Sequence, residues 1–323
     1  MSGSYGLAGG TARRVVVVVA GPTASGKSAL ALTLAEAFDG IVINADSMQV
    51  YDALRILTSR PSAADEARAP HRLYGVLPAA ETCSAARWRA LAVDEITAAH
   101  DAGRLPIVTG GTGLYIRALI EGLAPIPEID EAIRQRARAL HATLGGPAFH
   151  DRLAALDGEM AARLSPGDSQ RMIRAFEVIE ATGRSLAEWH RLPAAAGGLA
   201  QPALSLVLSP PREALYAACD GRFAAMIEAG ALDEVRALDS LGLDSAAPVM
   251  KALGVRPLRR HLTGESSLGQ AIAAAQQATR NYAKRQVTWF HHQIARAVVY
   301  DRRYSPEMAP DIIAVTSRFL LTE

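Results

Sequence analysis

The chain has 323 residues, of which 50% are hydrophobic and 21% are charged, and its formal net charge is +1. This composition is that of an ordinary globular protein, with enough residues for one large domain or two modest ones. No apolar run approaches the roughly eighteen residues that a membrane span requires, and Met1 to Arg14 lacks the apolar stretch of a secretory signal. We therefore expect a cytoplasmic protein with no membrane partner.

The two cysteines, Cys83 and Cys219, are far apart in the sequence and form no C-x-x-C pair. Neither a disulfide framework nor a zinc site is indicated, and we expect both side chains to be buried as small hydrophobic groups. A net charge near zero neither supports nor excludes a nucleic-acid partner, because binding depends on local basic surface.

Strands and helices are predicted to alternate in the first part of the chain. Val15 to Ala20 is a nearly continuous β-branched run, typical of a buried strand in a parallel sheet. A glycine-rich segment follows, and Ala29 to Phe38 then has helical spacing. Further strands are predicted at Ile41 to Asn44 and Leu105 to Thr109, with a helix at Ala85 to Ala99 between them. This order indicates an α/β architecture.

The middle of the chain is predicted to be an all-helical insertion. From Gly122 to about Leu192, charged alanine-rich segments are interrupted at Gly145-Gly146-Pro147 and again at Ser165 to Asp168. Ala194 to Gly198 has the composition of a flexible return linker.

Beyond the linker, Leu204 to Leu208 has the composition of another strand of the sheet, and the rest is predicted to be helical. The last helix is expected from about Leu268 to Val298. These elements divide the chain into a core domain, residues 1–121 and 196–323, and an insertion domain, residues 122–195.

A phosphate-binding motif lies between the first predicted strand and the first helix. Gly21 to Ser28 reads G-P-T-A-S-G-K-S and matches G-x-x-x-x-G-K-[ST] in the context that this motif requires. Backbone N–H groups of such a loop, with the positive end of the helix dipole, bind phosphate oxygens. The fold expected for the core domain is therefore a P-loop-type parallel sheet flanked by helices. The residues predicted to bind a diphosphate are Gly21, Pro22, Thr23, Ala24, Ser25, Gly26, Lys27 and Ser28.

The loop identifies a polyphosphate but no reaction. A nucleoside triphosphatase normally has a second strand that ends in a magnesium-binding aspartate. Here Leu105 to Thr109 leads instead into Gly110-Gly111-Thr112-Gly113-Leu114-Tyr115. The usual hydrolytic residues are therefore not apparent.

Further motifs give the sequence a close resemblance to the tRNA dimethylallyltransferases. The phosphate loop and the later segments occur in that family's order and spacing over roughly residues 15 to 295. The later segments are Asn44 to Tyr51, Pro70 to Leu73, Gly110 to Tyr115, Gln170-Arg171 with Arg174, Arg222-Phe223, and Lys284 to Phe290.

The resemblance implies the transfer of a dimethylallyl group from dimethylallyl diphosphate to N6 of the adenosine immediately 3′ of the anticodon. The exocyclic amine of adenine is a poor nucleophile, so a base must take its proton as the C–N bond forms. Asp46 matches the family position of that base. Lys27, the loop amides, Mg²⁺ and Arg222 would neutralise the departing diphosphate, with Thr112 near the reacting groups and Ser28 holding the metal.

The resemblance also implies that the anticodon stem-loop of tRNA is a partner, since the adenine must be drawn out of its stack. Arg280 and Lys284 lie one turn apart on the last predicted helix, a spacing suited to adjacent phosphates. We expect a monomer. The expected tRNA contacts are Asp46, Ser47, Met48, Gln49, Thr112, Arg134, Gln170, Arg171, Met172, Ile173, Arg174, Lys251, Arg280, Lys284, Arg285 and Gln286.

Three alternatives remain open from the residues alone: a P-loop small-molecule kinase, a non-catalytic RNA-binding protein, and a prenyltransferase that acts on free AMP. A kinase would explain the phosphate loop and leave the Asp46 segment unexplained. An AMP-directed enzyme would not need the insertion or the basic last helix. The family pattern itself is broken at Val255 and His291, where individual RNA contacts stay open.

Overall fold

The structure is a computed structural model, and it describes residues 14–194, 196–294 and 296–322. The segment in which we expected no secretory signal, Met1 to Arg14, therefore lies outside the described residues except for Arg14. The chain forms two compact units. The first runs to Ile120 and resumes at Leu199, and the second spans Glu121–Gly198.

A six-stranded parallel sheet is the centre of the first unit, in the order β3-β2-β4-β1-β7-β8. The valine-rich β1 lies between β4 and β7 and is buried on both faces, as its composition predicts. The strands are β1 (Val16–Ala20), β2 (Gly40–Asn44), β3 (His71–Arg72), β4 (Leu105–Gly110), β7 (Ala203–Leu208) and β8 (Val298–Tyr300).

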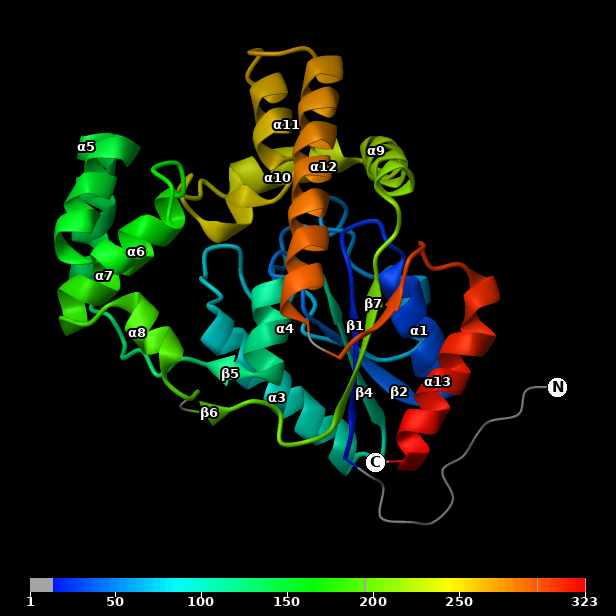
Figure 1. The fold of residues 1–323 in the computed structure, drawn as a ribbon. Helices are drawn as coiled ribbons and strands as arrows, with labels where there is room; N and C mark the ends of the chain where they lie inside the picture. The colour runs from blue at the N-terminus through cyan, green and yellow to red at the C-terminus, as the bar shows by residue number, and fades with distance from the viewer. Residues whose placement is uncertain (1–13, 195, 295, 323) are drawn as a thin grey trace. The chain divides into compact units, whose positions relative to one another are not determined.

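Helices cover both faces of this sheet. Alternate residues of β1 enter two different apolar clusters: Val17 and Val19 pack with α1 and α13, while Val16 and Val18 pack with α3 and α4. Figure 1 shows α1 and α13 together on one side of the strands and α3 and α4 on the other. These helices are α1 (Lys27–Ala37), α3 (Ala85–Asp101), α4 (Gly113–Ile120) and α13 (Ala309–Thr322), and the short α2 (Ala63–Arg68) precedes β3.

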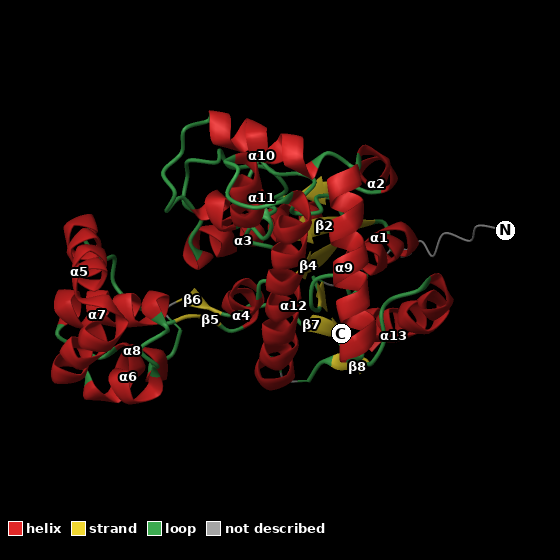
Figure 2. Cartoon of the chain, turned by 90° about the horizontal axis from the view of Figure 1, so that it is seen from above, coloured by secondary structure: helices red, strands yellow, loops and turns green. Residues whose placement is uncertain are grey.

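Four more helices follow β7 and extend the apolar cluster that contains Val16 and Val18. The long α12 contacts α9, α11 and α4, and Figure 2 shows α12 and α9 side by side. The helices are α9 (Arg212–Glu228), α10 (Ala231–Ser240), α11 (Val255–Leu262) and α12 (Leu268–Gln293), with 3₁₀ turns at Pro248–Lys251 and Pro306–Met308.

The prediction of one helix from Leu268 to Val298 is wrong at its end. Helix α12 ends at Gln293, and Val298–Tyr300 pairs in parallel with β7 as an edge strand. The β-branched Val298-Val299 pair favours a strand, and the open edge of β7 supplies the hydrogen bonds. The final helix α13 comes after this strand as an element separate from α12.

The second unit is helical, with its own core around Phe149, Leu153, Met172 and Phe176. A two-stranded antiparallel pair, β5 (Gly122–Leu123) with β6 (Ala196–Gly197), joins its two ends. Part of the predicted linker is therefore a short strand, and Ala195 lies outside the described residues. The helices are α5 (Glu131–Leu156), α6 (Gly158–Arg163), α7 (Ser169–Thr182) and α8 (Leu186–Arg191).

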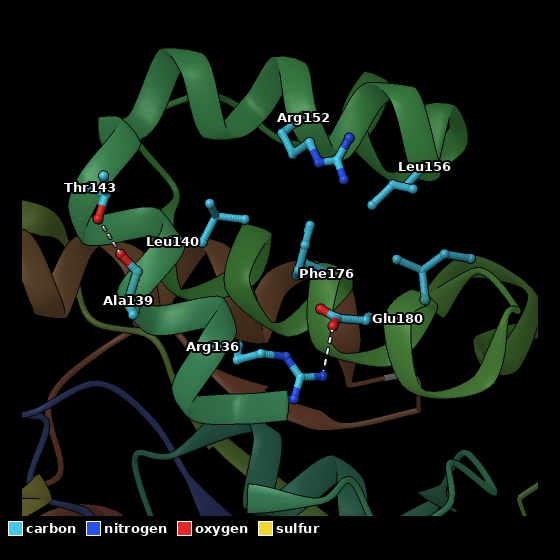
Figure 3. A pocket seen from close by; sticks show the side chains of 9 residues that line it. Arg136, Ala139, Leu140, Thr143, Arg152, Leu156, Phe176 and Glu180 are labelled. Carbon is cyan, nitrogen blue, oxygen red and sulfur yellow. Dashed lines mark hydrogen bonds and ion pairs between the residues drawn. The ribbon is translucent and has the colours of Figure 1, made fainter. Parts of the chain in front are cut away.

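The span of α5 consists of two helical stretches separated at Gly145, whose φ of +74° and ψ of 171° are non-helical, so the predicted interruption at Gly145-Gly146-Pro147 is present. Figure 3 shows the cavity of about 630 Å³ that opens between α5 and α7, with Arg136 ion-paired to Glu180 at 2.8 Å. None of the residues that line it belongs to the predicted site.

Across residues 14–194, 196–294 and 296–322, the structure contains no helix with the length and apolar character that crossing a bilayer requires. The two cysteines differ in burial: Cys219 is fully buried, as expected, whereas Cys83 is only half-buried.

Candidate active site

The phosphate loop, Gly21–Ser28, joins β1 to α1 as the motif predicts. The backbone geometry of the loop requires glycine at two positions. A side chain on Gly21 would place Cβ 2.8 Å from the carbonyl oxygen of Leu208, and Gly26 has φ +90°, a conformation that L-residues rarely adopt. The loop therefore turns tightly and leads its amides into the N-terminal turn of α1, a geometry that favours a bound anion.

Lys27 and Arg222 are two of the cations at this loop. Lys27 Nζ donates to the carbonyl oxygen of Pro22 at 3.3 Å, and the Arg222 guanidinium donates to the Thr23 hydroxyl. Burial lowers the pKa of Lys27 to about 8, although Asp46 opposes this shift, and burial also lowers the pKa of Arg222. Both groups are thus held in a poorly hydrated position, where a bound anion would stabilise their charges.

Asp46 lies in a tight turn directly after β2. Its backbone N–H donates to Asn44 Oδ1 at 2.8 Å, and its own Oδ1 accepts from the Met48 N–H at 2.9 Å. The buried Asn44 also donates to the carbonyl oxygens of Asp46 and Leu73, each at 3.0 Å. Because these bonds tie the turn to the sheet, the carboxylate has a fixed direction.

Thr112 holds the same turn from the neighbouring loop after β4. Its hydroxyl accepts from the Ser47 N–H at 2.9 Å and donates to Ser47 Oγ at 3.2 Å. The approach is close, since a Cβ on Gly110 would lie 2.2 Å from the carbonyl oxygen of Ala45. Gly113 is required similarly, because a Cβ there would lie 2.3 Å from the Trp289 ring.

One cavity of about 270 Å³ connects these groups. Thr23 and Arg222 line it beside the phosphate loop, Asp46 also lines it, and the other lining residues include both apolar and polar side chains. Leu57, Met226 and Leu253 are among the apolar residues that sequence reasoning missed. Met226 follows Phe223 at i+3 on α9, so helical spacing from the Arg222-Phe223 motif is the signal that could have found it. The lining residues are Thr23, Asp46, Ser47, Met48, Leu57, Thr58, Cys219, Arg222, Phe223, Met226, Lys251, Ala252, Leu253, Thr279, Tyr282 and Arg285.

Helix α12 contributes both to this cavity and to the surface. Tyr282 and Arg285 line the cavity, and burial raises the pKa of the Tyr282 hydroxyl well above its usual range, with Asp46 adding to the effect. Lys284 is exposed. Gln286 is 5% exposed, and its amide is bonded within the chain, so the structure places it beneath the surface that the sequence assigned to RNA.

Arg280 also has partners within the chain. Its guanidinium bonds both carboxylate oxygens of Asp220, at 2.6 and 2.7 Å, and donates to Gln277. Helical spacing places Arg280 and Lys284 on one face, but only Lys284 of the two is free of such an ion pair among the described residues. Gln49 is likewise occupied, since its amide nitrogen donates to the carbonyl oxygens of Thr58 and Ser59.

The predicted RNA contacts of the second unit differ in exposure. Gln170 and Arg171 are exposed on α7, and Arg174 is ion-paired with Glu177. Met172 is fully buried in the helical core, and Ile173 packs against that core. Arg134, on α5, is half-buried near Glu131.

Fold and cavity together define a P-loop α/β protein with a phosphate loop, a fixed carboxylate and an apolar recess around one ligand space. Over residues 49–293 the chain matches the family described as IPP transferase. It is 61% identical to a tRNA dimethylallyltransferase of Rhodospirillum centenum, over 91% of this chain and 93% of the relative. A tRNA dimethylallyltransferase of Paramagnetospirillum magneticum is 57% identical, over 95% and 97% of the two chains.

Solved structures agree. The full-length tRNA isopentenylpyrophosphate transferase of Bacillus halodurans is 32% identical, with a TM-score of 0.69 over 95% of this chain and 97% of that chain. A eukaryotic dimethylallyltransferase acting on tRNA gives a TM-score of 0.79 at 26% identity, over 96% and 80%. The chain belongs to the IPP transferase family, the tRNA dimethylallyltransferases, and is a transferase.

Proposed function

We infer that this protein transfers the dimethylallyl group of dimethylallyl diphosphate to N6 of the adenosine immediately 3′ of the anticodon in tRNA. The single observation that supports this most is the cavity in which the phosphate loop, the Asp46 carboxylate and an apolar recess meet. The cations at the loop suit a diphosphate, the apolar lining residues suit a short prenyl chain, and the carboxylate suits removal of an amine proton.

Asp46 is proposed as the general base and the loop cations as the groups that receive the leaving diphosphate. The adenine nitrogen forms a bond to the allylic carbon while its proton moves to Asp46. The C–O bond breaks, and its electron pair leaves with the diphosphate. Lys27, Arg222 and the loop amides stabilise that growing negative charge, and Thr112 keeps the Asp46–Ser47 turn beside them.

Mg²⁺ is the proposed divalent cofactor. It prefers oxygen ligands and binds through few protein groups when phosphate oxygens are present. Ser28 is exposed on the first turn of α1, so its hydroxyl fits that role. The ion would neutralise part of the diphosphate charge.

The activity is tested by incubating the protein with labelled dimethylallyl diphosphate and Mg²⁺ in separate assays containing tRNA, AMP or ATP. We expect label in tRNA alone. Label in AMP would identify the AMP-directed alternative, and phosphoryl transfer from ATP would identify the kinase. Gel filtration and cell fractionation test the accompanying proposals of a monomer located in the cytoplasm.

The size of the cavity predicts selection for a five-carbon donor. Its volume of about 270 Å³ is small for a ligand site, since such sites occupy about 300–1,000 Å³. Geranyl diphosphate, with ten carbons, should have a kcat/KM about five- to 150-fold lower, because overpacking costs about 1–3 kcal/mol. Met226→Ala enlarges the cavity and should reduce this difference. Equal use of both donors by the unmodified protein would contradict the assignment of the cavity.

Exposed cations of α12 are proposed to contact RNA phosphates. Replacing Lys284 with alanine should lower the slope of log affinity against log salt by about 0.7 to 0.9, the value of one phosphate contact. Arg280→Ala is the matched control. It removes a charge from the same helix face, but the Arg280 guanidinium already pairs with Asp220. Binding of tRNA measured at several salt concentrations checks this. If Arg280→Ala lowered the salt slope and Lys284→Ala did not, Lys284 would not be the phosphate contact and the assignment would be contradicted.

The affinity for diphosphate should depend on pH through Lys27. Its pKa in the free protein is about 8, and a bound anion favours the charged form. Binding therefore takes up a proton above pH 8, so affinity is full below that pH and falls up to about ten-fold per unit above it. Ionisation of the ligand does not add to this dependence, because the second phosphate ionisation, near pH 6, is complete at pH 8. Titration of an unreactive diphosphate analogue at pH 7, 8 and 9 measures this, and Lys27→Arg, which stays charged, should remove the dependence.

A further inference from the structure

We propose that Gln286 is a positioning residue, which holds the phosphate loop and the Asp46 turn in register with each other. This inference rests on the proposed function. Gln286 Oε1 accepts from the backbone N–H of Thr23 at 2.8 Å, and Nε2 donates to the carbonyl oxygen of Gly111 at 2.7 Å. The side chain is 5% exposed, so water cannot replace these bonds.

The two bonds reach two different loops of the reaction site. Thr23 receives the Arg222 guanidinium on its hydroxyl, at the end of the cavity that would hold the diphosphate. Gly111 directly precedes Thr112, whose hydroxyl fixes the turn beside Asp46. One amide therefore joins the phosphate loop to the loop that holds the Asp46 turn.

Only a side chain with a donor and an acceptor at this reach can make both bonds, and a primary amide of this length provides them. Gln286 also lies on a buried stripe of α12, with Thr279, Ala283 and Phe290, between exposed faces of the helix. Its role thus differs from that of the neighbouring Lys284: it faces the reaction site rather than the proposed RNA surface.

Removing either bond should misalign the two halves of the site without removing a reacting group. A displacement of about 1 Å can lower a rate by about 10². Gln286→Met keeps the length and loses both bonds, while Gln286→Asn keeps the amide and is one methylene too short to span the gap. We expect both variants to lower the single-turnover rate by about 10- to 100-fold, with tRNA affinity within about two-fold. The thermal midpoint should fall by a few degrees, because two buried backbone groups lose their partners, while the protein stays folded at the assay temperature.

Gln276→Met is the matched control. Gln276 is a half-buried glutamine on the same helix, and its amide donates to the backbone carbonyl of Asp220 at 3.1 Å, away from the phosphate loop. The same substitution there removes a comparable bond between helices and should leave the rate unchanged.

A second variant tests the contact from the other partner. A Cβ on Gly111 would lie 2.3 Å from Gln286 Nε2, so Gly111→Ala should displace the amide while Gln286 is retained. Its rate should fall to a similar extent, and combining it with Gln286→Met should add little, since both remove one interaction.

The outcomes separate this inference from the proposed function. An unmodified protein that does not prenylate tRNA refutes the function itself. If the unmodified protein is active and Gln286→Met or Gly111→Ala matches it in rate, the positioning role is refuted. A parallel fall of rate, tRNA affinity and thermal midpoint in both variants would also refute it, because that pattern is one of general destabilisation.

Discussion

Asp46→Asn is expected to lower the single-turnover rate of prenyl transfer by about 10²- to 10⁴-fold, the usual contribution of a general base. Asparagine keeps an oxygen that can accept from the Met48 N–H, a bond of 2.9 Å in the structure, so the turn should persist. It cannot accept a proton at neutral pH. Rapid-quench measurement with saturating tRNA and donor isolates this step.

Binding of tRNA and of diphosphate should be nearly unchanged in Asp46→Asn, because the groups that hold each ligand remain. Asp52→Asn is the control: it removes the same charge from an exposed position nearby and should leave the rate unaltered. A rate equal to that of the unmodified protein would remove Asp46 from the role of base.

Lys27→Met should weaken diphosphate binding and also slow the chemical step. A hydrogen bond to a charged group contributes about 1.5–3 kcal/mol, which predicts donor affinity about 10- to 100-fold lower. Charge on the leaving group grows in the transition state, so the rate should fall by a further factor of about 10² to 10³. Calorimetry with diphosphate and single-turnover kinetics measure the two effects.

Lys284→Met provides the comparison, since it removes a lysine from the exposed side of α12 and should leave diphosphate affinity intact. Were diphosphate affinity unchanged in Lys27→Met while the rate fell, Lys27 would act only in the transition state. Together with the Asp46 variant, these measurements distinguish loss of the base from loss of anion stabilisation.

Much of the site could be predicted from local sequence. The β-branched run before Gly21 determines a buried strand, and the glycines with Lys27 determine the phosphate loop after it, because these preferences act within a few residues. Asp46 was likewise predictable as a residue at the carboxyl end of a strand. The family of the chain, predicted from ordered motifs, is confirmed.

Local sequence could not predict features that depend on a partner far away in the sequence. Their spacing of four residues places Arg280 and Lys284 on one face of the helix. Whether that face offers free charge depends on Asp220, which lies 60 residues earlier and neutralises Arg280. Similarly, the end of the predicted helix at about Val298 has no local signal that places it, and the free edge of β7 pairs Val298–Tyr300 as a strand.

Short segments with strong local requirements are enough to determine the phosphate loop and the position of Asp46 at the end of a strand. Tertiary structure decided the direction of Gln286 and the shape of the cavity. Gln286 shares the buried spacing of Ala283 and Phe290, but its function depends on two backbone groups 263 and 175 residues away. A buried amide takes its role from the groups that satisfy it, and folding alone brings those groups together.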